Sequence, residues 1–492
     1  MRKVKIFATV ASVMLGFMFF ATAQVMAATA EEDCGLRVFD GTTALQIACE
    51  STASAPTSPL QIIKNGVARG IILVDITDPD ATPARIQTAA GLKALKALST
   101  APFTCNTANK IIASDGEKDD QFGRDVSISG DYAVAGAPLE ATKGTQAGAA
   151  YIFKRNSSNG QFQQIQKIIA DDTKAFDGFG NSLEVSGDYA IIGAPTINGV
   201  GAGAAYVFKR NSSSDQWEQV NKLMASDAQA GDYFGQSISI SGDYAIIGAY
   251  GEDTKGSLAG AAYVFKRNSS NGQWEQVNKL MASDAQAGDH FGGSISIDGD
   301  YAIIGANHEN TKGAEAGAAY VFKRNSSNGQ FQQIQKIMAN DANGAEFFGM
   351  SISIDGNYAV ISADHEDAGG ANRGAAYFFK RNTTTDQFEQ IQKIVPSDLE
   401  PWDEFGSSVA INGDNAIVGA LPVDAGAGAA YLFQRNSATD QFEKVIKISG
   451  SELGAGYFGS SISIDEDYAI VGANKGVGAA YIIKLCGNPT LD

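Results

Sequence analysis

Cysteine, histidine and tryptophan are scarce in this chain of 492 residues, which holds four cysteines, three histidines and three tryptophans. Positive charge is also in short supply, because 37 lysines and arginines face 55 acids and leave a formal net charge of −18. So acidic a chain would repel phosphate groups, which argues against nucleic acid and anionic membrane surfaces as partners. Three histidines without a surrounding motif support no Ser-His-Asp set, and no other catalytic group of residues stands out. The chain is therefore expected not to be an enzyme.

Long apolar runs are absent except near the start, where Ile6 to Ala23 follows the basic stretch MRKVK. With the small residues that end at Ala27, this pattern is typical of a secretory signal peptide over residues 1–27. An uncleaved membrane anchor is the alternative, since the run approaches the length of a bilayer span. No later stretch could span a membrane. We therefore expect a protein that is secreted, periplasmic or on the cell surface, with no membrane insertion after signal cleavage.

The chain contains 55 glycines, and many of them fall in a sequence segment that recurs along the chain. FGQSISISGDYAIIGAY starts at Phe234, and close variants start at six other Phe-Gly pairs: Phe122, Phe179, Phe291, Phe348, Phe405 and Phe458. Successive copies are 57, 55, 57, 57, 57 and 53 residues apart. A period of this size indicates a repeat architecture.

One copy reads as four short strands. Around Phe234 these are expected at 237–240, 244–247, 261–267 and 273–281, separated by Gly-, Ser- and Asn-rich turns. The copy is thus a four-stranded antiparallel meander, and seven such meanders predict an all-β, seven-bladed β-propeller. A solenoid of stacked hairpins is the competing architecture.

The two ends of the repeat decide between these architectures. The last copy lacks its fourth strand, whereas Cys105–Asp115, before the first copy, aligns with the fourth strand at Phe162–Asp172. A strand from the N-terminal side would therefore complete the last blade and close the ring. On that alignment Cys105 and Cys486 flank the same hairpin, which predicts a disulfide between them. Cys34 and Cys49, which bracket a hairpin-like segment, form the other expected pair.

The expected domains are a signal peptide at 1–27, a small N-terminal β module at 28–103 and the propeller at 104–492. The Phe-Gly starts, the Gly-Ala-Pro at Gly136 and Gly193, and the Gly-Ala-Ala-Tyr-Val-Phe strands resemble the FG-GAP repeat of integrin α subunits and many bacterial exported proteins. The resemblance implies a propeller that recognises ligands through one loop face. This chain departs from the family in its two-residue turns, such as Ser241-Gly242, because these turns are too short to form the integrin-type calcium loop. No cofactor is expected.

Acids recur in the loops of that face. One stands two residues before the Phe in six copies, at Asp120, Asp177, Asp232, Asp289, Glu346 and Asp403. Because they recur in nearly every copy, we interpret them as acceptors for backbone N–H groups of their own loops.

Residues that break the repeat are better candidates for a site. His290, His308 and His365 fall in loops of one face in adjacent blades, and carboxylates accompany two of them, at Glu309, Glu366 and Asp367. They could hold a divalent metal or an oxygen-rich ligand, and solvated polar loops are the plainer interpretation. Trp402 could stack on a sugar or anchor a partner.

These features predict an exported, monomeric interaction protein whose propeller loop face binds an extracellular protein or glycan, in adhesion or surface recognition. The alternative is a propeller enzyme that acts on polysaccharide as a lyase or hydrolase. A scaffold that serves only as a surface protein is the third interpretation. Trp402 has no counterpart in other loops, which favours protein over glycan.

Overall fold

The computed structural model describes residues 108–485 except 197–200, 368–370 and 423–425, and the backbone of eight strands before them. The chain divides into two compact units, Met1–Thr104 and Cys105–Asp492. In the part of the chain so described, no helix is long and apolar enough to cross a membrane.

The first unit contains small antiparallel sheets. β1 (Ala8–Ala11) pairs with β2 (Ala21–Thr22) and β6 (Ile71–Val74); β3 (Leu36–Phe39), β4 (Ala44–Cys49) and β5 (Leu60–Ile63) form a second sheet; β7 (Arg85–Thr88) pairs with β8 (Gly91–Ala94). Most of the expected signal peptide lies outside the described residues, as do Cys34, Cys105 and Cys486, while Cys49 ends β4. The signal peptide and both disulfides therefore stay predictions.

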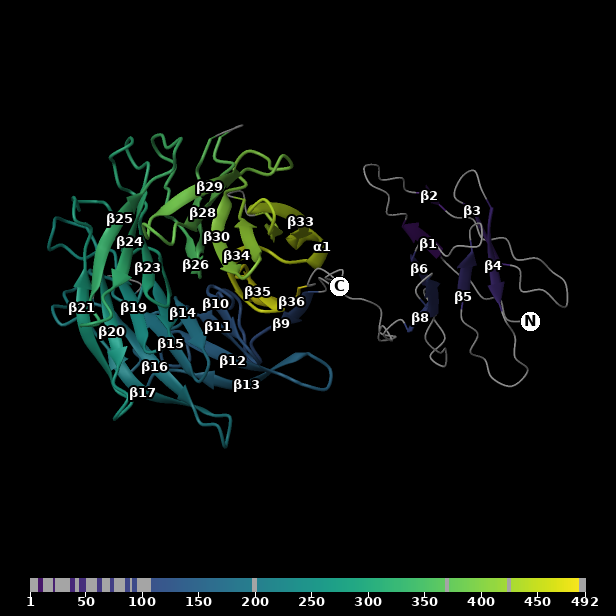
Figure 1. Cartoon of the computed structure of the whole chain (residues 1–492). Coiled ribbons are helices and arrows are strands. Elements are labelled where there is room, and N and C mark those ends of the chain that lie inside the picture. Colours follow the sequence, from purple (N-terminus) through teal and green to yellow (C-terminus); the bar gives the residue numbers. More distant parts are fainter. Residues whose placement is uncertain are drawn as a thin grey trace. The chain divides into compact units, whose positions relative to one another are not determined.

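The second unit is a ring of seven four-stranded antiparallel sheets around a central axis (Figure 1), as the repeats predicted. Blade 1 consists of β10 (Val126–Ser129), β11 (Tyr132–Ala137), β12 (Ala149–Arg155) and β13 (Phe162–Ile168); blade 2 of β14 (Leu183–Ser186), β15 (Tyr189–Ala194), β16 (Ala204–Arg210) and β17 (Trp217–Leu223); blade 3 of β18 (Ile238–Ser241), β19 (Tyr244–Ala249), β20 (Ala261–Arg267) and β21 (Trp274–Leu280). Blade 4 consists of β22 (Ile295–Asp298), β23 (Tyr301–Ala306), β24 (Ala318–Arg324) and β25 (Phe331–Ile337); blade 5 of β26 (Ile352–Asp355), β27 (Tyr358–Ala363), β28 (Ala375–Arg381) and β29 (Phe388–Ile394); blade 6 of β30 (Phe405–Asn412), β31 (Asn415–Ala420), β32 (Ala429–Asn436) and β33 (Gln441–Ser449). The short helix α1 (Gly450–Leu453) leads into blade 7.

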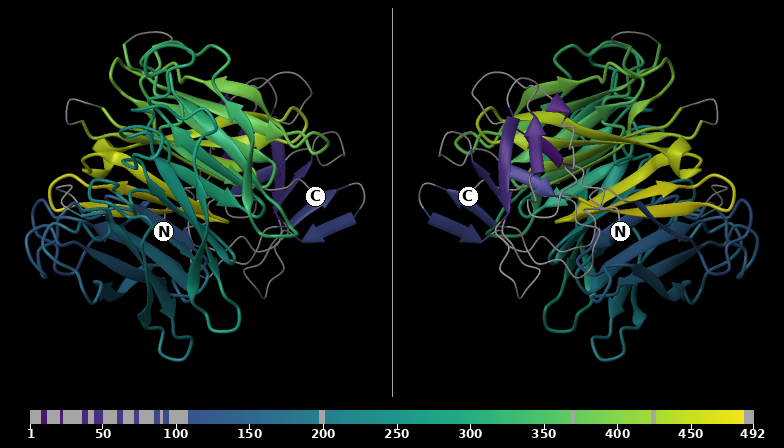
Figure 2. Two further views of the ribbon diagram at one scale, coloured as in Figure 1. Left: turned by 90° about the vertical axis from the view of Figure 1, so that its left-hand side faces the viewer. Right: turned by 90° about the vertical axis from the view of Figure 1, so that its right-hand side faces the viewer.

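Blade 7 closes the ring as predicted. Its strands β34 (Phe458–Asp465), β35 (Tyr468–Ala473) and β36 (Ala479–Lys484) are joined by β9 (Ala108–Ile111), which comes from the other end of the unit. Ala108 pairs with Ile483, and Ile111 with Ala480. Side views show the blue first blade beside the yellow last blade (Figure 2). This pairing excludes the solenoid, whose ends would lie apart.

The hydrophobic core of the propeller lies between blades. Seven clusters of buried side chains occur in the described part of the ring, and each joins two neighbouring blades. The cluster between blades 3 and 4, for example, packs Ile246 and Val264 against Phe291 and Ile295. Because every blade packs both faces against its neighbours, its first three strands are rich in apolar and small residues, whereas the outermost fourth strand, such as FQQIQKI in β13, is mostly polar.

The repeated Phe-Gly and Gly-Ala pairs are explained by close backbone contact between blades. Gly292 has φ +91°, and a Cβ there would lie 2.4 Å from the carbonyl oxygen of Ala261 in the preceding blade. A Cβ on Gly248 would lie 2.1 Å from the carbonyl oxygen of Gly292. Only glycine fits such positions, because real Cβ atoms cannot approach so closely. The preceding Phe291 is fully buried against Tyr320 and Phe322 of its own blade.

The innermost strands of neighbouring blades are joined by hydrogen bonds to side chains rather than by backbone hydrogen bonds of a shared sheet. On six of the seven innermost strands, a serine or carboxylate accepts the backbone N–H of the next blade's innermost strand. At one equivalent position along the innermost strands, six backbone N–H groups donate such a bond over 2.9–3.2 Å. The donors and acceptors are Ile128 to Ser463, Val185 to Ser127, Ile240 to Glu184, Ile297 to Ser239, Ile354 to Ser296 and Ile411 to Ser353. These bonds satisfy N–H groups that an edge strand would otherwise leave free. Blade 6 has Ala410 at this position, and its methyl side chain cannot accept the corresponding N–H of blade 7.

Candidate functional site

One face of the ring carries the loops that precede each first strand and those between second and third strands; we name it the loop face. In all seven copies the residue that directly precedes Phe-Gly on this face has a positive φ angle. Blade 2 has Gly178 there, with φ 66°, and the other six are Gln121 (φ 59°), Tyr233 (55°), His290 (58°), Phe347 (55°), Glu404 (45°) and Tyr457 (59°). A left-handed conformation costs a non-glycine residue on the order of 1 kcal/mol. Because it recurs in every copy, the conformation belongs to the repeat and does not by itself mark a site.

Three of these residues, Tyr233, His290 and Phe347, belong to a continuous line of ring contacts across blades 3, 4 and 5, which we name the aromatic row. Tyr233 stacks on Tyr250 with ring centroids 5.0 Å apart and planes 2° from parallel. The line continues from Tyr250 to His290 at 5.3 Å, to His308 at 4.3 Å, to Phe347 at 5.0 Å and to His365 at 4.8 Å. All six side chains are half-buried. The row thus presents a strip of ring surface, one ring wide, to solvent.

Carboxylates surround the end of the row at His365. Its Nδ1 lies 3.0 Å from Oδ1 of Asp364, which is 5% exposed, and its Nε2 lies 3.7 Å from Oε1 of Glu404. The hydrogen bond to Asp364 raises the pKa of His365 above its ordinary value. Burial, followed by the nearby charge of Asp364, raises the pKa of Glu404. An imidazole between two acids can exchange a proton with a bound molecule near neutral pH.

The other two histidines differ from His365. Burial, together with the charge of His308, lowers the pKa of His290. His308 Nδ1 lies 3.2 Å from Oε1 of Glu315, a loop residue of its own blade. His290 and His308 are in direct contact, whereas Phe347 separates His308 from His365. The three histidines therefore share one row without converging on one point.

The carboxylates expected beside the histidines do not line the row. Glu309 and Glu366 are 4% exposed, and their Oε1 atoms bind Lys336 at 2.9 Å and Lys393 at 2.7 Å. Asp367 accepts the backbone N–H of Asn372 and so shapes its own loop. Within the residues that the structure describes, no group of three or more His, Cys, Asp or Glu side chains is arranged to hold a metal ion.

Trp402 lies on the loop face with its side chain 47% exposed and φ 69°. Its backbone N–H donates to the carbonyl of Ala371. It stands two residues before Glu404, close along the chain to the His365 end of the row.

The acids of the loops have structural partners. Each of the six acids two residues before Phe accepts the backbone N–H three residues earlier, as interpreted from the sequence. A second set forms ion pairs with lysines of the fourth strands: Asp115, Asp172, Asp227, Asp284, Asp341 and Asp398. Neither set is free to make a ring of ligands.

Sequence reasoning missed Tyr233, Tyr250, Phe347, Asp364 and Glu404. A signal for the row was present, because the residue before Phe-Gly is aromatic or histidine in three successive copies, at Tyr233, His290 and Phe347. The contacts of Tyr250 and Asp364 carry no such signal, since they depend on how two loops meet.

Comparison with known proteins identifies the repeat. The FG-GAP repeat family matches six segments, residues 106–153, 162–208, 217–265, 274–322, 331–379 and 388–433. Each segment begins with the fourth strand of one blade and ends with the third strand of the next. No curated protein matches the chain.

Solved structures with a similar fold share little sequence. A protein from Lactobacillus plantarum aligns with a TM-score of 0.45 and 14% identity, over 66% of this chain and 84% of that one. A putative 6-phosphogluconolactonase from Bacteroides fragilis has a TM-score of 0.45 and 13% identity, with the same coverage. The periplasmic gluconolactonase of Pseudomonas aeruginosa has a TM-score of 0.43 and 16% identity, again with that coverage. These likenesses concern the fold and name no substrate for this chain.

The prediction that the protein is not an enzyme is nevertheless wrong in light of these structures. Two of these structures are named as lactonases. The sequence argument had relied on the lack of a recognisable catalytic set. That reasoning fails because loops from different blades can bring reactive groups together without a motif, as Asp364, His365 and Glu404 illustrate.

Proposed function

The chain belongs to the FG-GAP repeat family, and from this premise we propose that it is an exported protein whose loop face binds an extracellular glycan. The observation that carries the proposal is the aromatic row of six half-exposed rings in unbroken contact. A sugar ring has a face of C–H groups and a rim of hydroxyls. Aromatic rings with hydrogen-bonding groups beside them suit both parts.

The shape and charge of the row narrow the class of glycan. A strip that is one ring wide and crosses three blades fits an extended chain of sugars better than the broad, close-packed patch of a protein interface. The formal charge of −18, with Asp364 and Glu404 at one end of the row, disfavours anionic polysaccharides. A neutral or amino-bearing glycan is therefore the proposed ligand.

Glycine variants test the row without disturbing the backbone, because Gly178 already occupies the matching position in blade 2. We expect Tyr233→Gly and Phe347→Gly each to weaken glycan binding by roughly two- to tenfold, the value of one aromatic contact. Tyr457→Gly is the matched control, since Tyr457 precedes Phe458-Gly in blade 7 with φ 59° and lies outside the row.

The measurement is a screen of neutral, amino-bearing and anionic polysaccharides by affinity electrophoresis, followed by calorimetry with the best binder. Equal binding by the parent protein and both row variants would refute the glycan-binding row. Binding of anionic polysaccharides alone would refute the proposed ligand class.

A second candidate function is cleavage of the bound polysaccharide, which the set of Asp364, His365 and Glu404 favours. A histidine that is hydrogen-bonded to a buried acid, with its other nitrogen 3.7 Å from a second carboxylate, can act as a general acid or base. We would incubate the protein with the bound glycan and measure new reducing ends and unsaturated products. His365→Ala should abolish product, while Glu315→Gln, which alters only the neighbour of His308, should not. A parent protein that binds glycan and releases no product would exclude this candidate and leave the first intact.

A further inference from the structure

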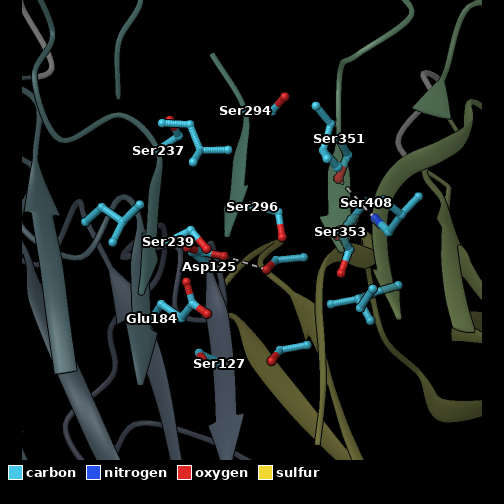
Figure 3. Close-up of a pocket in the computed structure, with 18 of the residues that line it drawn as sticks. Asp125, Ser127, Glu184, Ser237, Ser239, Ser294, Ser296, Ser351, Ser353 and Ser408 are labelled. Carbon is cyan, nitrogen blue, oxygen red and sulfur yellow. Dashed lines mark hydrogen bonds between the residues drawn. The ribbon is translucent and has the colours of Figure 1, made fainter. Parts of the chain in front are cut away.

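The axis of the propeller contains a cavity of about 650 Å³ that is distinct from the aromatic row. It is lined by the innermost strands of all seven blades, and serine is the commonest residue in its wall (Figure 3). Asp364 and Glu404 of the loop face also border it, so the cavity lies next to the His365 end of the row. A volume of this size is typical of small-molecule sites, which span roughly 300–1,000 Å³, and far exceeds what a bare ion needs.

Most polar groups in the cavity wall already serve the contact between blades. Asp125 replaces the serine found at its level in the other copies, and all its bonds are internal: Oδ1 accepts the Ser461 hydroxyl at 2.6 Å, and Oδ2 accepts the Leu183 N–H at 2.7 Å. The serines that bind the next blade's N–H groups are committed in the same way. These groups define the wall and leave little for a ligand.

Two groups in the wall, the carboxyl of Glu184 and the hydroxyl of Ser408, can still form hydrogen bonds to a ligand. Glu184 stands where five other copies have serine, and its Oε2 accepts the Ile240 N–H of the next blade at 2.9 Å. Its carboxyl group is also hydrogen-bonded to the Ser239 side chain. A carboxyl group can form more hydrogen bonds than these two, so it retains capacity for a ligand. Ser408, only 9% exposed, lines the cavity, and its hydroxyl makes no hydrogen bond to another described residue. The hydroxyl of Ser460, in the same wall, is fully buried without a partner among the described residues. A buried polar group without a partner is costly and calls for an explanation.

We propose that the axial cavity binds a small neutral polyhydroxylated molecule, a free mono- or disaccharide, through Glu184 and Ser408. Sugar hydroxyls both donate and accept, as a wall of hydroxyl and carboxyl groups requires. Burial raises the pKa of Glu184 to about 8, so this group is mostly protonated and uncharged at neutral pH. An uncharged carboxyl favours a neutral ligand over a cation.

The test uses variants that adopt the repeat's own residue. Glu184→Ser restores the serine of blades 1, 3, 4, 5 and 7 and keeps an acceptor for Ile240, so the ring should fold. Glu184→Gln is the second, nearly isosteric variant. Ser408→Ala removes the free hydroxyl. Glu218→Ser, on the exposed outer strand of blade 2, is the matched control. Calorimetry and ligand-observed NMR would be run with glucose, N-acetylglucosamine, maltose and sorbitol.

We expect at least one sugar to bind the parent protein and the Glu218 control equally, and to bind Glu184→Ser and Ser408→Ala up to about tenfold more weakly, the loss of one hydrogen bond. Tyr233→Gly and Phe347→Gly should leave this binding unchanged, which separates the cavity from the glycan-binding row.

Two results would overturn the inference. One is no sugar binding by the parent protein, or binding that the Glu184 and Ser408 variants retain in full. The other is binding of calcium or an amine, stronger above pH 8 and lost in Glu184→Ser, which would make the cavity a cation site instead.

Discussion

His290 and His308 pack edge to face on the loop face, with ring centroids 4.3 Å apart and planes at 64°. They stand on two successive loops of blade 4, and together they continue the line of rings from Tyr250 to Phe347. Two imidazoles in contact cannot both carry charge without repulsion, while His365, beside Asp364, gains from its charge. The row therefore contains one histidine with a lowered pKa, His290, and one with a raised pKa, His365.

The titration of the histidines should reflect this difference. We expect the pKa of His290 to lie below, and that of His365 above, the ordinary value for histidine, as measured by NMR. His365 then contributes stability that is full below its unfolded pKa and is lost as pH rises through its folded pKa. His290 contributes stability that is present above its unfolded pKa and is lost as pH falls through its folded pKa. Asp364→Asn should lower the pKa of His365 and leave that of His290 unchanged. An unshifted His365 in this variant would contradict the assigned cause.

The break in the inter-blade hydrogen bonds at Ala410 predicts a stabilising substitution. A hydroxyl at this position could accept the N–H of Ile464, as Ser353 accepts that of Ile411 at 3.1 Å. Ala410→Ser should raise the free energy of unfolding by about 1 kcal/mol. Ser353→Ala, the opposite change one blade earlier, should lower it by about 1–3 kcal/mol because it leaves a buried N–H without a partner. Denaturant unfolding of the two variants measures both effects, and a destabilised Ala410→Ser would show that the site has no room for the hydroxyl.

Two lysines, Lys336 of the fourth strand β25 and Lys380 of the third strand β28, should contribute differently to stability because they differ in burial. Lys336 is 17% exposed and binds both Asp284, at 2.7 Å, and the nearly buried Glu309, at 2.9 Å. Lys336→Met leaves Glu309 without its cation, and we expect a loss of about 3–5 kcal/mol. Lys380 pairs with Asp440 at 2.5 Å but is 41% exposed, so Lys380→Met should cost less than about 1 kcal/mol. Similar losses in the two variants, measured by denaturant unfolding, would show that the burial of Glu309 is unimportant.

The disulfide across the closing blade can be tested chemically. Cys105 lies three residues before Ala108 and Cys486 three residues after Ile483, and these two flanking residues pair with each other in blade 7. We expect peptide mapping of the protein without reductant to recover Cys105 linked to Cys486, and Cys34 linked to Cys49. Reduction should lower the melting temperature, because the bridge joins the two ends of the ring. Any link between the two pairs would refute the assignment.

The repeated residues alone determined the architecture. Phe-Gly, Gly-Ala and the alternating Ser and Ile recur at a regular period because each copy makes the same contacts with its neighbour, such as the approach of Gly248 to the carbonyl of Gly292. The missing fourth strand of the last copy and its counterpart near Ala108 were enough to predict closure of the ring. The loop acids were also interpreted correctly, since their partners lie only three residues away.

The candidate site was decided by the tertiary structure. Phe347 joins His308 to His365, and Tyr233 meets Tyr250, because loops of one blade and its neighbours converge on one face. The sequence could mark His290, His308 and His365 as unusual but could not show that Glu309 and Glu366 turn inward to lysines. Likewise, Glu184 and Ser408 come together in one cavity only when seven strands surround an axis. Contacts that repeat leave a periodic trace in the sequence, whereas a site formed by departures from the repeat depends on distances that only the closed ring defines.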